Sequence, residues 1–299
     1  MPDQFNEPVA VLGIGAMGHG IASSALRAGI PTIVWNRDPT ATRDFAERGA
    51  EVAESAADAV ARAGIVVTMV SDADAVISLA RDHGMLAALA PNAIWVQMST
   101  IGVAGIERVA EMVEAERPDV TLLDAPVSGS SDPAEHGQLT IFASGPEAVH
   151  ERVARLFHAI GRRTIWVGPV GTGSQLKLVA NTWLAFSSEA LAASVALAHQ
   201  FGLVTETVMD ALGGGPLVSP WQDAKLQRVL KREFSAQFAL SLALKDVRLA
   251  LEAADAGQFA ALAGLANEWQ LVVDRGLGDQ DVTVVTRALE DPAFDYSLA

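Results

Sequence analysis

Short apolar segments alternate with amphipathic segments from residue 8 to about residue 168. The apolar segments are bounded by Gly, Pro, Asn or Asp, and the amphipathic ones carry apolar residues at helical spacing, so the pattern predicts alternating strands and helices. Strands that are apolar throughout are buried on both faces, which is typical of a mostly parallel sheet covered by helices on each side. The predicted strands are 8–15, 31–37, 64–70, 92–98, 120–126 and 139–145.

The pattern changes after residue 168. Residues 172 to about 200 contain no proline and no glycine after Gly173, and their high content of Ala and Leu predicts one long helix of roughly 25 residues. Helical patterns continue to residue 290, and residues 293–299 are expected to form a loose tail. We therefore predict a doubly wound α/β domain over 1–168 and an all-helical domain over 169–299, joined by the long helix.

Composition narrows the choice of partners. The net charge of −15 argues against nucleic acid, because binding to a phosphate backbone needs a basic face. No stretch of about 20 apolar residues is available for a membrane span, and the segment "MPDQFNEP" lacks a signal pattern, so we expect a cytoplasmic protein without membrane contact. The chain has no cysteine, and its six histidines lack metal-ligand spacing, so no metal site is predicted.

Three glycines, Gly13, Gly15 and Gly18, stand in G-x-G-x-x-G spacing between the first predicted strand and a predicted helix. In a Rossmann-type domain such glycines allow a tight turn and close approach of a pyrophosphate, which the free N–H groups of the helix bind. The alternative is a packing turn that holds no ligand. The predicted cofactor loop comprises Gly13, Ile14, Gly15, Ala16, Met17 and Gly18.

Cofactor choice is expected to depend on the end of the second strand, where Asn36 and Arg37 stand. An arginine suits the 2′-phosphate of NADP, so NADP is favoured over NAD. The alternative is a solvated Arg37, with Asp38 making the selection. Residues that follow two later strands, most of them polar, are further candidates to line the cofactor, with helix capping as the alternative for the serines and the threonine. They are Val70, Ser71 and Asp72 after one strand, and Ser99 and Thr100 after the other.

Two further segments carry candidate chemistry. Ser128, Gly129 and Ser130 follow a predicted strand, and such a turn offers hydroxyl and N–H groups that could hold a carboxylate. Lys177 is the only Lys or Arg between Arg163 and Lys225, and it precedes Asn181 by four residues, so both would project from one helix face. The alternative for Lys177 is an ordinary lysine at a helix edge, with its ammonium in solvent.

Four motifs in order resemble those of the β-hydroxyacid dehydrogenases, a family that includes 3-hydroxyisobutyrate dehydrogenase. They are "GIGAMG", "DAPVSG", "GTGSQLKLVAN" and "LKDVRLALE". The segments "VSGSSDPAEHGQL" and "WNRD" look most like the glyoxylate and succinic semialdehyde reductase branch, which is NADPH-linked. The resemblance implies a Rossmann-type domain, a helical C-terminal domain, and a homodimer or homotetramer built through the latter.

The resemblance also implies roles for single residues. Lys177 would be the catalytic acid and base, and Asn181 would position the substrate beside it. The sequence departs from many relatives at Ser130, where they have glycine, and at Ala180, where they have asparagine, which leaves the substrate open. The other implied contacts are Ser128, Gly129 and Ser130 with the substrate carboxylate, Thr100 with the nicotinamide ribose, and Lys245 and Asp246 with the cofactor.

Two aromatic residues, Trp221 and Phe238, are candidates for the substrate pocket, with a place in the core as the alternative. The function predicted is an NADP(H)-dependent oxidoreductase that moves a hydride between the nicotinamide and a small carboxylate-bearing aldehyde or 3-hydroxy acid. Lys177 would protonate the oxygen that gains negative charge. The alternatives are an imine reductase of the same fold, in which the lysine is usually replaced, and a non-catalytic NADP-binding protein.

Overall fold

The computed structural model describes residues 7–291, apart from the side chain of Ala256. The chain forms two compact units, unit 1 up to Lys177 and unit 2 from Leu178 onward. The division falls within a single helix, α9 (Thr172–Gln200). Within residues 7–291, no helix combines the length with the hydropathy that a membrane span requires.

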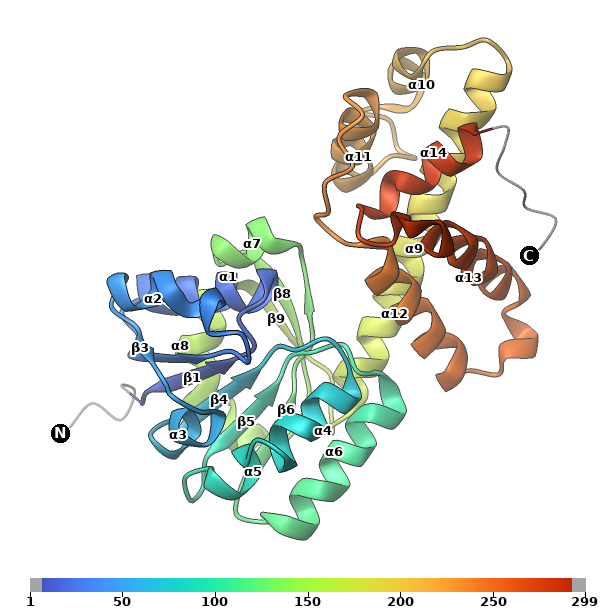
Figure 1. Cartoon of the computed structure of the whole chain (residues 1–299). Helices are drawn as coiled ribbons and strands as arrows, with labels where there is room; N and C mark the ends of the chain where they lie inside the picture. The colour runs from blue at the N-terminus through green and yellow to red at the C-terminus, as the bar shows by residue number, and fades with distance from the viewer. Residues whose placement is uncertain (1–6, 292–299) are drawn as a thin grey trace. The chain divides into compact units, whose positions relative to one another are not determined.

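Unit 1 is built on a six-stranded parallel sheet with the strand order β3-β2-β1-β4-β5-β6 (Figure 1). Five of the six predicted strands belong to it. The order reverses between β1 and β4, which is the switch point where doubly wound sheets bind ligands beyond the carboxyl ends of the strands. The strands are β1 (Val9–Leu12), β2 (Thr32–Trp35), β3 (Glu51–Val52), β4 (Ile65–Thr68), β5 (Ile94–Gln97) and β6 (Thr121–Asp124).

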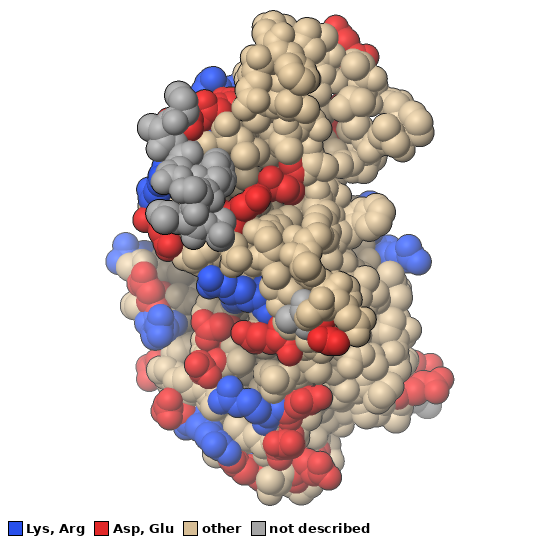
Figure 2. Space-filling model, turned by 90° about the vertical axis from the view of Figure 1, so that its right-hand side faces the viewer, with Lys and Arg blue, Asp and Glu red and all other residues tan. Residues whose placement is uncertain are grey.

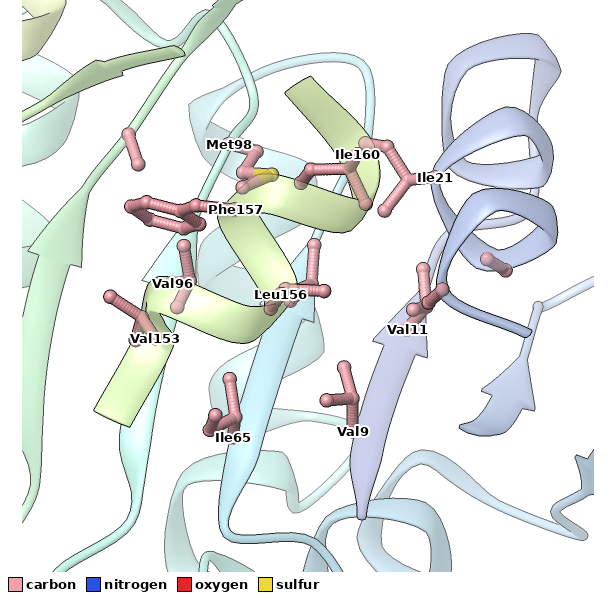
Figure 3. Close-up of a cluster of buried hydrophobic side chains, with 14 of the residues drawn as sticks. Val9, Val11, Ile21, Ile65, Val96, Met98, Val153, Leu156, Phe157 and Ile160 are labelled. Carbon is pink, nitrogen blue, oxygen red and sulfur yellow. The ribbon is translucent and has the colours of Figure 1, made fainter. Parts of the chain in front are cut away.

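Successive residues of these strands enter two different cores. Val9 and Val11 of β1 pack on one face of the sheet, whereas Ala10 and Leu12 pack on the other, as the two-residue period of a strand requires. In Figure 3 side chains from β1, β4 and β5 face those of helix α8. The helices of unit 1 are α1 (Ala16–Arg27), α2 (Arg43–Glu47), α3 (Ala56–Ala61), α4 (Ala73–Arg81), α5 (Met85–Ala88), α6 (Gly102–Glu116), α7 (Ser131–Glu135), α8 (His150–Ile160), and the 3-10 helices η1 (Pro39–Thr42) and η2 (Glu147–Val149).

A second, three-stranded sheet corrects the sequence-based prediction. The segment predicted as strand 139–145 forms β8 (Leu139–Ala143), which pairs antiparallel with β7 (Val127–Ser128) and parallel with β9 (Gly161–Trp166). Strand β9 was not predicted, because Arg162 and Arg163 are exposed and interrupt its apolar pattern.

Over residues 178–291, the regular elements of unit 2 are helices joined by loops, which confirms the predicted all-helical domain. Its main core surrounds the fully buried Trp269, and the predicted long helix is observed as the 29 residues of α9. The predicted loose tail lies outside the described residues. The other helices are α10 (Thr205–Leu212), α11 (Pro220–Leu230), α12 (Leu240–Ala253), η3 (Ala256–Gln258), α13 (Ala260–Val272), the π-helical η4 (Val273–Leu277), η5 (Val282–Val284) and α14 (Val285–Glu290).

Candidate active site

The three loop glycines differ in their surroundings. Gly13 has φ +94°, and a Cβ there would lie 2.3 Å from the Met69 carbonyl oxygen beyond β4. A Cβ on Gly18 would lie 1.8 Å from the Gly13 carbonyl oxygen, so only glycine allows α1 to pack this closely on the turn. Gly15 is exposed, and a Cβ there would meet nothing within 4 Å. Gly13 and Gly18 therefore allow close packing of the turn, whereas Gly15 faces open space.

The N-terminus of α1 lies beside that open space. Gly15 is its N-cap residue, no side chain caps the helix, and Ala16 is exposed. The first N–H groups of an α-helix lack intrahelical acceptors and favour an anion. Ile14 differs, because its N–H donates to Asn36 Oδ1 at 2.9 Å. The turn thus has the room and the donors that a dinucleotide pyrophosphate needs.

Asn36 ties this turn to the end of β2, since its Nδ2 also donates to the Asp38 carbonyl oxygen at 2.9 Å. The Asp38 carboxylate accepts hydrogen bonds from the backbone N–H and hydroxyl of Thr40, and these bonds lower the pKa of Asp38. Arg37 is exposed, and no hydrogen bond or ion pair joins it to another described residue. Arg43, which the sequence reasoning did not select, is also exposed, and its charge contributes to the lowered pKa of Asp38.

Residues after β4 and β5 brace the carboxyl edge of the sheet. The Ser99 hydroxyl is fully buried and accepts the N–H of Val70 at 2.8 Å, so it joins the ends of these two strands. Asp72 caps α4 by accepting the N–H of Ala75 at 2.8 Å, and the Ser71 hydroxyl donates to Asp72 at 2.7 Å. The residue that caps α4 is therefore Asp72, for which the sequence predicted only a place beside the cofactor. Thr100 is half-buried and lies one residue before the N-cap of α6.

The serine turn is held against α1 through helix α7. The Ser24 hydroxyl donates to the carbonyl oxygens of Ala134 and Glu135 at 2.9 and 3.0 Å, which fixes α7 on the helix that begins at the glycine turn. Ser128 and Ser130 are half-buried, and Gly129 is exposed with φ +137°. No hydrogen bond links the side chains of Ser128 and Ser130 to another residue that the structure describes. One helix thus positions both turns within unit 1.

A buried aspartate fixes the start of α9. Asp124, at the end of β6, is fully buried, and its carboxylate accepts the N–H and the hydroxyl of Ser174 at 2.7 and 2.8 Å. Burial raises the pKa of Asp124, although the hydrogen bonds from Ser174 and Ser144 oppose the shift. The sequence reasoning noted Asp124 only as a strand end and assigned it no role.

Lys177 follows Ser174 by three residues and is only 9% exposed. Asn181, four residues later on α9, is 6% exposed and donates from Nδ2 to Asp246 Oδ2 at 2.5 Å. Lys245 lies 3.0 Å from the other oxygen of the same carboxylate. Within unit 2, Asp246 therefore connects Asn181 with Lys245, two of the predicted site residues. Lys245 also lines a hollow of about 380 Å³ together with residues of α12, α13 and η4.

The two aromatic candidates pack against the core of unit 2 and are partly buried. A buried ion pair lies beside them, in which Lys225 Nζ contacts both Asp281 oxygens at 2.9 and 2.8 Å. Lys225 lies 5.7 Å from the ring centre of Trp221, and Asp281 accepts the N–H of Phe238 at 3.2 Å. Contacts with the core and with the Lys225–Asp281 pair therefore position the rings of Trp221 and Phe238.

Neither surface charge nor metal-ligating side chains mark a further site among the residues that the structure describes. On the face drawn in Figure 2, acidic and basic side chains are interspersed without a continuous basic area. Across residues 7–291, no group of three or more His, Asp or Glu side chains is arranged to hold a metal ion.

Two family models together match most of the chain. One, described as the NAD binding domain of 6-phosphogluconate dehydrogenase, matches residues 8–168. The other, described as NAD-binding of NADP-dependent 3-hydroxyisobutyrate dehydrogenase, matches residues 171–289.

Individual proteins agree with these models. The chain is 31% identical to glyoxylate/succinic semialdehyde reductase 1 of Arabidopsis thaliana, over 94% of this chain and 98% of that protein. It is 30% identical to the cytokine-like nuclear factor N-PAC of Homo sapiens over 95% of this chain, but it spans only 51% of N-PAC. The crystal structure of 3-hydroxyisobutyrate dehydrogenase from Salmonella typhimurium superposes with a TM-score of 0.85 at 26% identity, over 94% of this chain and 99% of that chain. The chain therefore belongs to the β-hydroxyacid dehydrogenase family and is an NAD(P)-dependent oxidoreductase.

Proposed function

We propose that this enzyme is an NADPH-dependent reductase of small carboxylate-bearing aldehydes, of the glyoxylate and succinic semialdehyde class, or runs the reverse oxidation of a 3-hydroxy acid. The observation that carries the proposal is Lys177, a lysine only 9% exposed on a helix whose first turn is held by the buried Asp124. The similarity to the Arabidopsis reductase supports the substrate class. Residues 1–168 would form the NADP-binding domain and residues 169–299 the substrate domain.

The cofactor would be held mainly by the glycine turn. Gly15 has the open space, and α1 has the uncapped N-terminus, that suit the pyrophosphate. When bound, the cofactor supplies or accepts the hydride at the carbonyl carbon of the substrate. The further residues proposed to contact it are Gly13, Ile14, Ala16, Met17, Gly18, Asn36, Arg37, Val70, Ser71, Asp72, Thr100, Lys245 and Asp246.

NADP would be preferred to NAD because of the loop that follows β2. Asp38, the alternative selecting residue, already accepts two hydrogen bonds from Thr40. Arg37 and Arg43 are exposed beside it, and a guanidinium can bind a phosphate through two parallel hydrogen bonds. The description of the second family model as NADP-dependent points the same way.

Lys177 would act as the general acid in reduction. The carbonyl oxygen gains negative charge as the hydride arrives, and an ammonium held beside it can donate a proton. In the oxidative direction the same Nζ atom would accept the proton of the hydroxyl group. Asn181 would position the substrate, since its amide is held in one orientation by Asp246.

The serine turn would bind the carboxylate of the substrate. Ser128 and Ser130 offer hydroxyl donors, and the backbone at Gly129 is exposed. Neutral donors can hold a carboxylate without a second cation next to Lys177. Trp221 and Phe238 would line the part of the pocket that receives the rest of the substrate.

Two other functions make different predictions. An imine reductase would share the fold, as the structures of such enzymes do at 21–22% identity, but would not need Lys177. A non-catalytic NADP-binding protein would bind the cofactor without turnover. The deciding experiment measures oxidation of NADPH and, separately, NADH with glyoxylate, succinic semialdehyde, methylmalonate semialdehyde, tartronate semialdehyde and a cyclic imine. Turnover of at least one aldehyde with NADPH supports the proposal, whereas turnover of the imine alone, or of nothing, rejects it.

Two expectations accompany this function. The family resemblance suggests a homodimer or homotetramer built through residues 169–299. The second is a cytoplasmic location, with which a chain without cysteine is compatible.

A further inference from the structure

The ring of His19, on α1, lies between side chains of two other helices of unit 1, α2 and α7 (Figure 1). Its Nε2 atom lies 3.0 Å from Asp44 Oδ2 of α2, and its Nδ1 atom lies 3.4 Å from Glu135 Oε2 of α7. The ring also contacts the buried Phe45 of α2, with 4.8 Å between the ring centres. A single imidazole therefore contacts a carboxylate on each of two helices.

Only a protonated His19 can donate to both carboxylates. A neutral imidazole carries one N–H group, whereas the imidazolium ion carries two. When the neutral ring donates to Asp44, it turns an unprotonated nitrogen toward Glu135. Histidine is the side chain that typically changes its charge between about pH 5 and pH 8. The bridge between α2 and α7 is therefore complete only while His19 carries its second proton.

Charged side chains surround the ring. Arg48 of α2 lies 3.4 Å from the Nε2 atom of His19, and it also binds Asp44 and Glu135, at 3.1 and 3.3 Å. Arg27 of α1 reaches Glu135 at 3.4 Å. Although burial acts to raise it, the pKa of Asp44 is lowered by hydrogen bonds from His19 and Arg48, so this carboxylate is ionised where histidine titrates. Protonation of His19 thus changes the net charge of these five side chains from zero to +1.

Helix α7 is a firm support for the bridge, because it is packed on α1 independently of His19. A Cβ on Gly20 would lie 2.6 Å from the Ala134 Cβ atom, so only glycine allows the two helices to approach this closely. The Ser24 hydroxyl adds its hydrogen bonds to the carbonyl oxygens of α7. A bridge from Asp44 to Glu135 therefore ties α2 to a closely packed pair of helices.

His19 is also close to the proposed pyrophosphate site along α1. Its backbone N–H donates to the Gly15 carbonyl oxygen at 2.8 Å, so it closes the first turn of the helix. One turn is about 5.4 Å, which is shorter than the Debye length of about 8–10 Å at moderate ionic strength. Helix α2 begins at Arg43, after the segment that carries Arg37. The bridge therefore connects the glycine turn with the segment proposed to bind the 2′-phosphate.

We propose that His19 is a positioning residue of the cofactor site, whose imidazolium ion bridges Asp44 and Glu135 and so holds α2 and the segment before it in place for the anionic cofactor. The cofactor binds more tightly while His19 is protonated, and its affinity falls as rising pH removes the proton. This inference rests on the proposed place of the pyrophosphate at the N-terminus of α1, and it is independent of Lys177 and of the substrate.

The test measures the Kd of NADP⁺ by isothermal titration calorimetry from pH 5.5 to pH 8.5, for the wild type and for His19→Gln. Glutamine keeps one donor and one acceptor group but carries no charge. The ratio of the variant Kd to the wild-type Kd should be about two to five at pH 5.5, the scale of one partly exposed ion pair, and should approach one at pH 8.5. The 2′-phosphate also titrates in this range, but both proteins bind the same ligand, so the ratio removes its contribution.

Two further variants separate charge from structure. His19→Lys supplies a charge that persists at pH 8.5, where it should bind NADP⁺ about two- to fivefold more tightly than the wild type. His158→Gln, at an exposed histidine of α8, should match the wild type at every pH. Circular dichroism verifies that all variants are folded.

A His19→Gln ratio that is constant or increases with pH overturns the inference, and so does a His19→Lys variant that binds like the wild type at pH 8.5. Either result leaves the proposed function in place, because the wild type still binds the cofactor. A wild type that fails to bind NADP⁺ at any pH would reject the proposed function together with this inference.

Discussion

Asn181 donates a hydrogen bond from Nδ2 to Asp246 Oδ2 at 2.5 Å, and both side chains are at most 6% exposed. Because a carboxylate can only accept, this bond identifies the Asn181 nitrogen and leaves its amide oxygen to face other partners. Asp246 also neutralises Lys245, which lies 3.0 Å from its second oxygen. A single buried carboxylate thus orients two residues proposed to contact substrate and cofactor.

Replacing Asp246 by asparagine should release that orientation. An amide keeps the shape of the side chain but removes the charge, and because it can both donate and accept, either end of the Asn181 amide could then face it. We expect kcat/KM to fall by about 10- to 100-fold, the scale of a small misplacement in an active site. Asp274→Asn, an exposed aspartate on η4, is the matched control and should retain wild-type kinetics. Equal kinetics in the two variants would remove Asp246 from the account.

Asp124, whose carboxylate accepts hydrogen bonds from Ser174 at the start of α9, should make the free energy of unfolding depend on pH. Burial raises the pKa of Asp124 in the folded protein, so just above pH 4 the folded state still binds a proton that the unfolded state has lost. The contribution of Asp124 to the free energy of unfolding is therefore largest below pH 4 and decreases as pH rises through the raised pKa. We expect the free energy of unfolding of the wild type, minus that of Asp124→Asn, to decrease between pH 4 and pH 7 in urea titrations. A difference that increases over this range contradicts the assignment.

The buried ion pair of unit 2 should matter for stability. Lys225→Met would leave Asp281 charged, fully buried and without its cation, and breaking such a pair costs about 3–5 kcal/mol. Lys231→Met makes the same chemical change at an exposed lysine and should stay within about 0.5 kcal/mol of wild type. Chemical denaturation measures both values. A loss below about 1 kcal/mol in Lys225→Met would show that Asp281 finds other compensation.

The preference for NADP can be tested at Arg37. Loss of a charge-assisted hydrogen bond costs about 1.5–3 kcal/mol, so Arg37→Ala should raise the KM for NADPH roughly 10- to 100-fold and leave the KM for NADH unchanged. Arg163→Ala is the control, since Arg163 is exposed on β9, in the second sheet of unit 1. An unchanged KM for NADPH in Arg37→Ala counts against a contact with the 2′-phosphate.

The features that could be predicted from the sequence are those that residues close together in the chain determine. The glycine turn was predictable because Gly13, Gly15 and Gly18 lie within six residues and between a strand and a helix. The hydrogen bonds of Ser174 with Asp124 and of Asn181 with Asp246 could not be predicted, because the partners lie 50 and 65 residues apart in the sequence. Spacing along the chain carries no information on such pairs.

Strand β9 shows a different limit. Its residues Arg162 and Arg163 are exposed, so the segment lacks the continuous apolar run that identified five of the six strands of the main sheet. A strand buried on one side only resembles a loop when charged residues interrupt a short pattern. The role of Ser71 was open for a related reason, because the residue types that cap a helix are also those that line a ligand site.

The central claim is that Lys177 supplies the proton, and one variant tests it most directly. Lys177→Ala should bind NADPH with wild-type affinity in a fluorescence titration, because no cofactor contact is assigned to this side chain. With saturating NADPH and the preferred aldehyde, its kcat should fall by a factor of about 10²–10⁴, the scale of a general acid. A folded Lys177→Ala variant that binds NADPH and turns over at the wild-type rate would contradict the account.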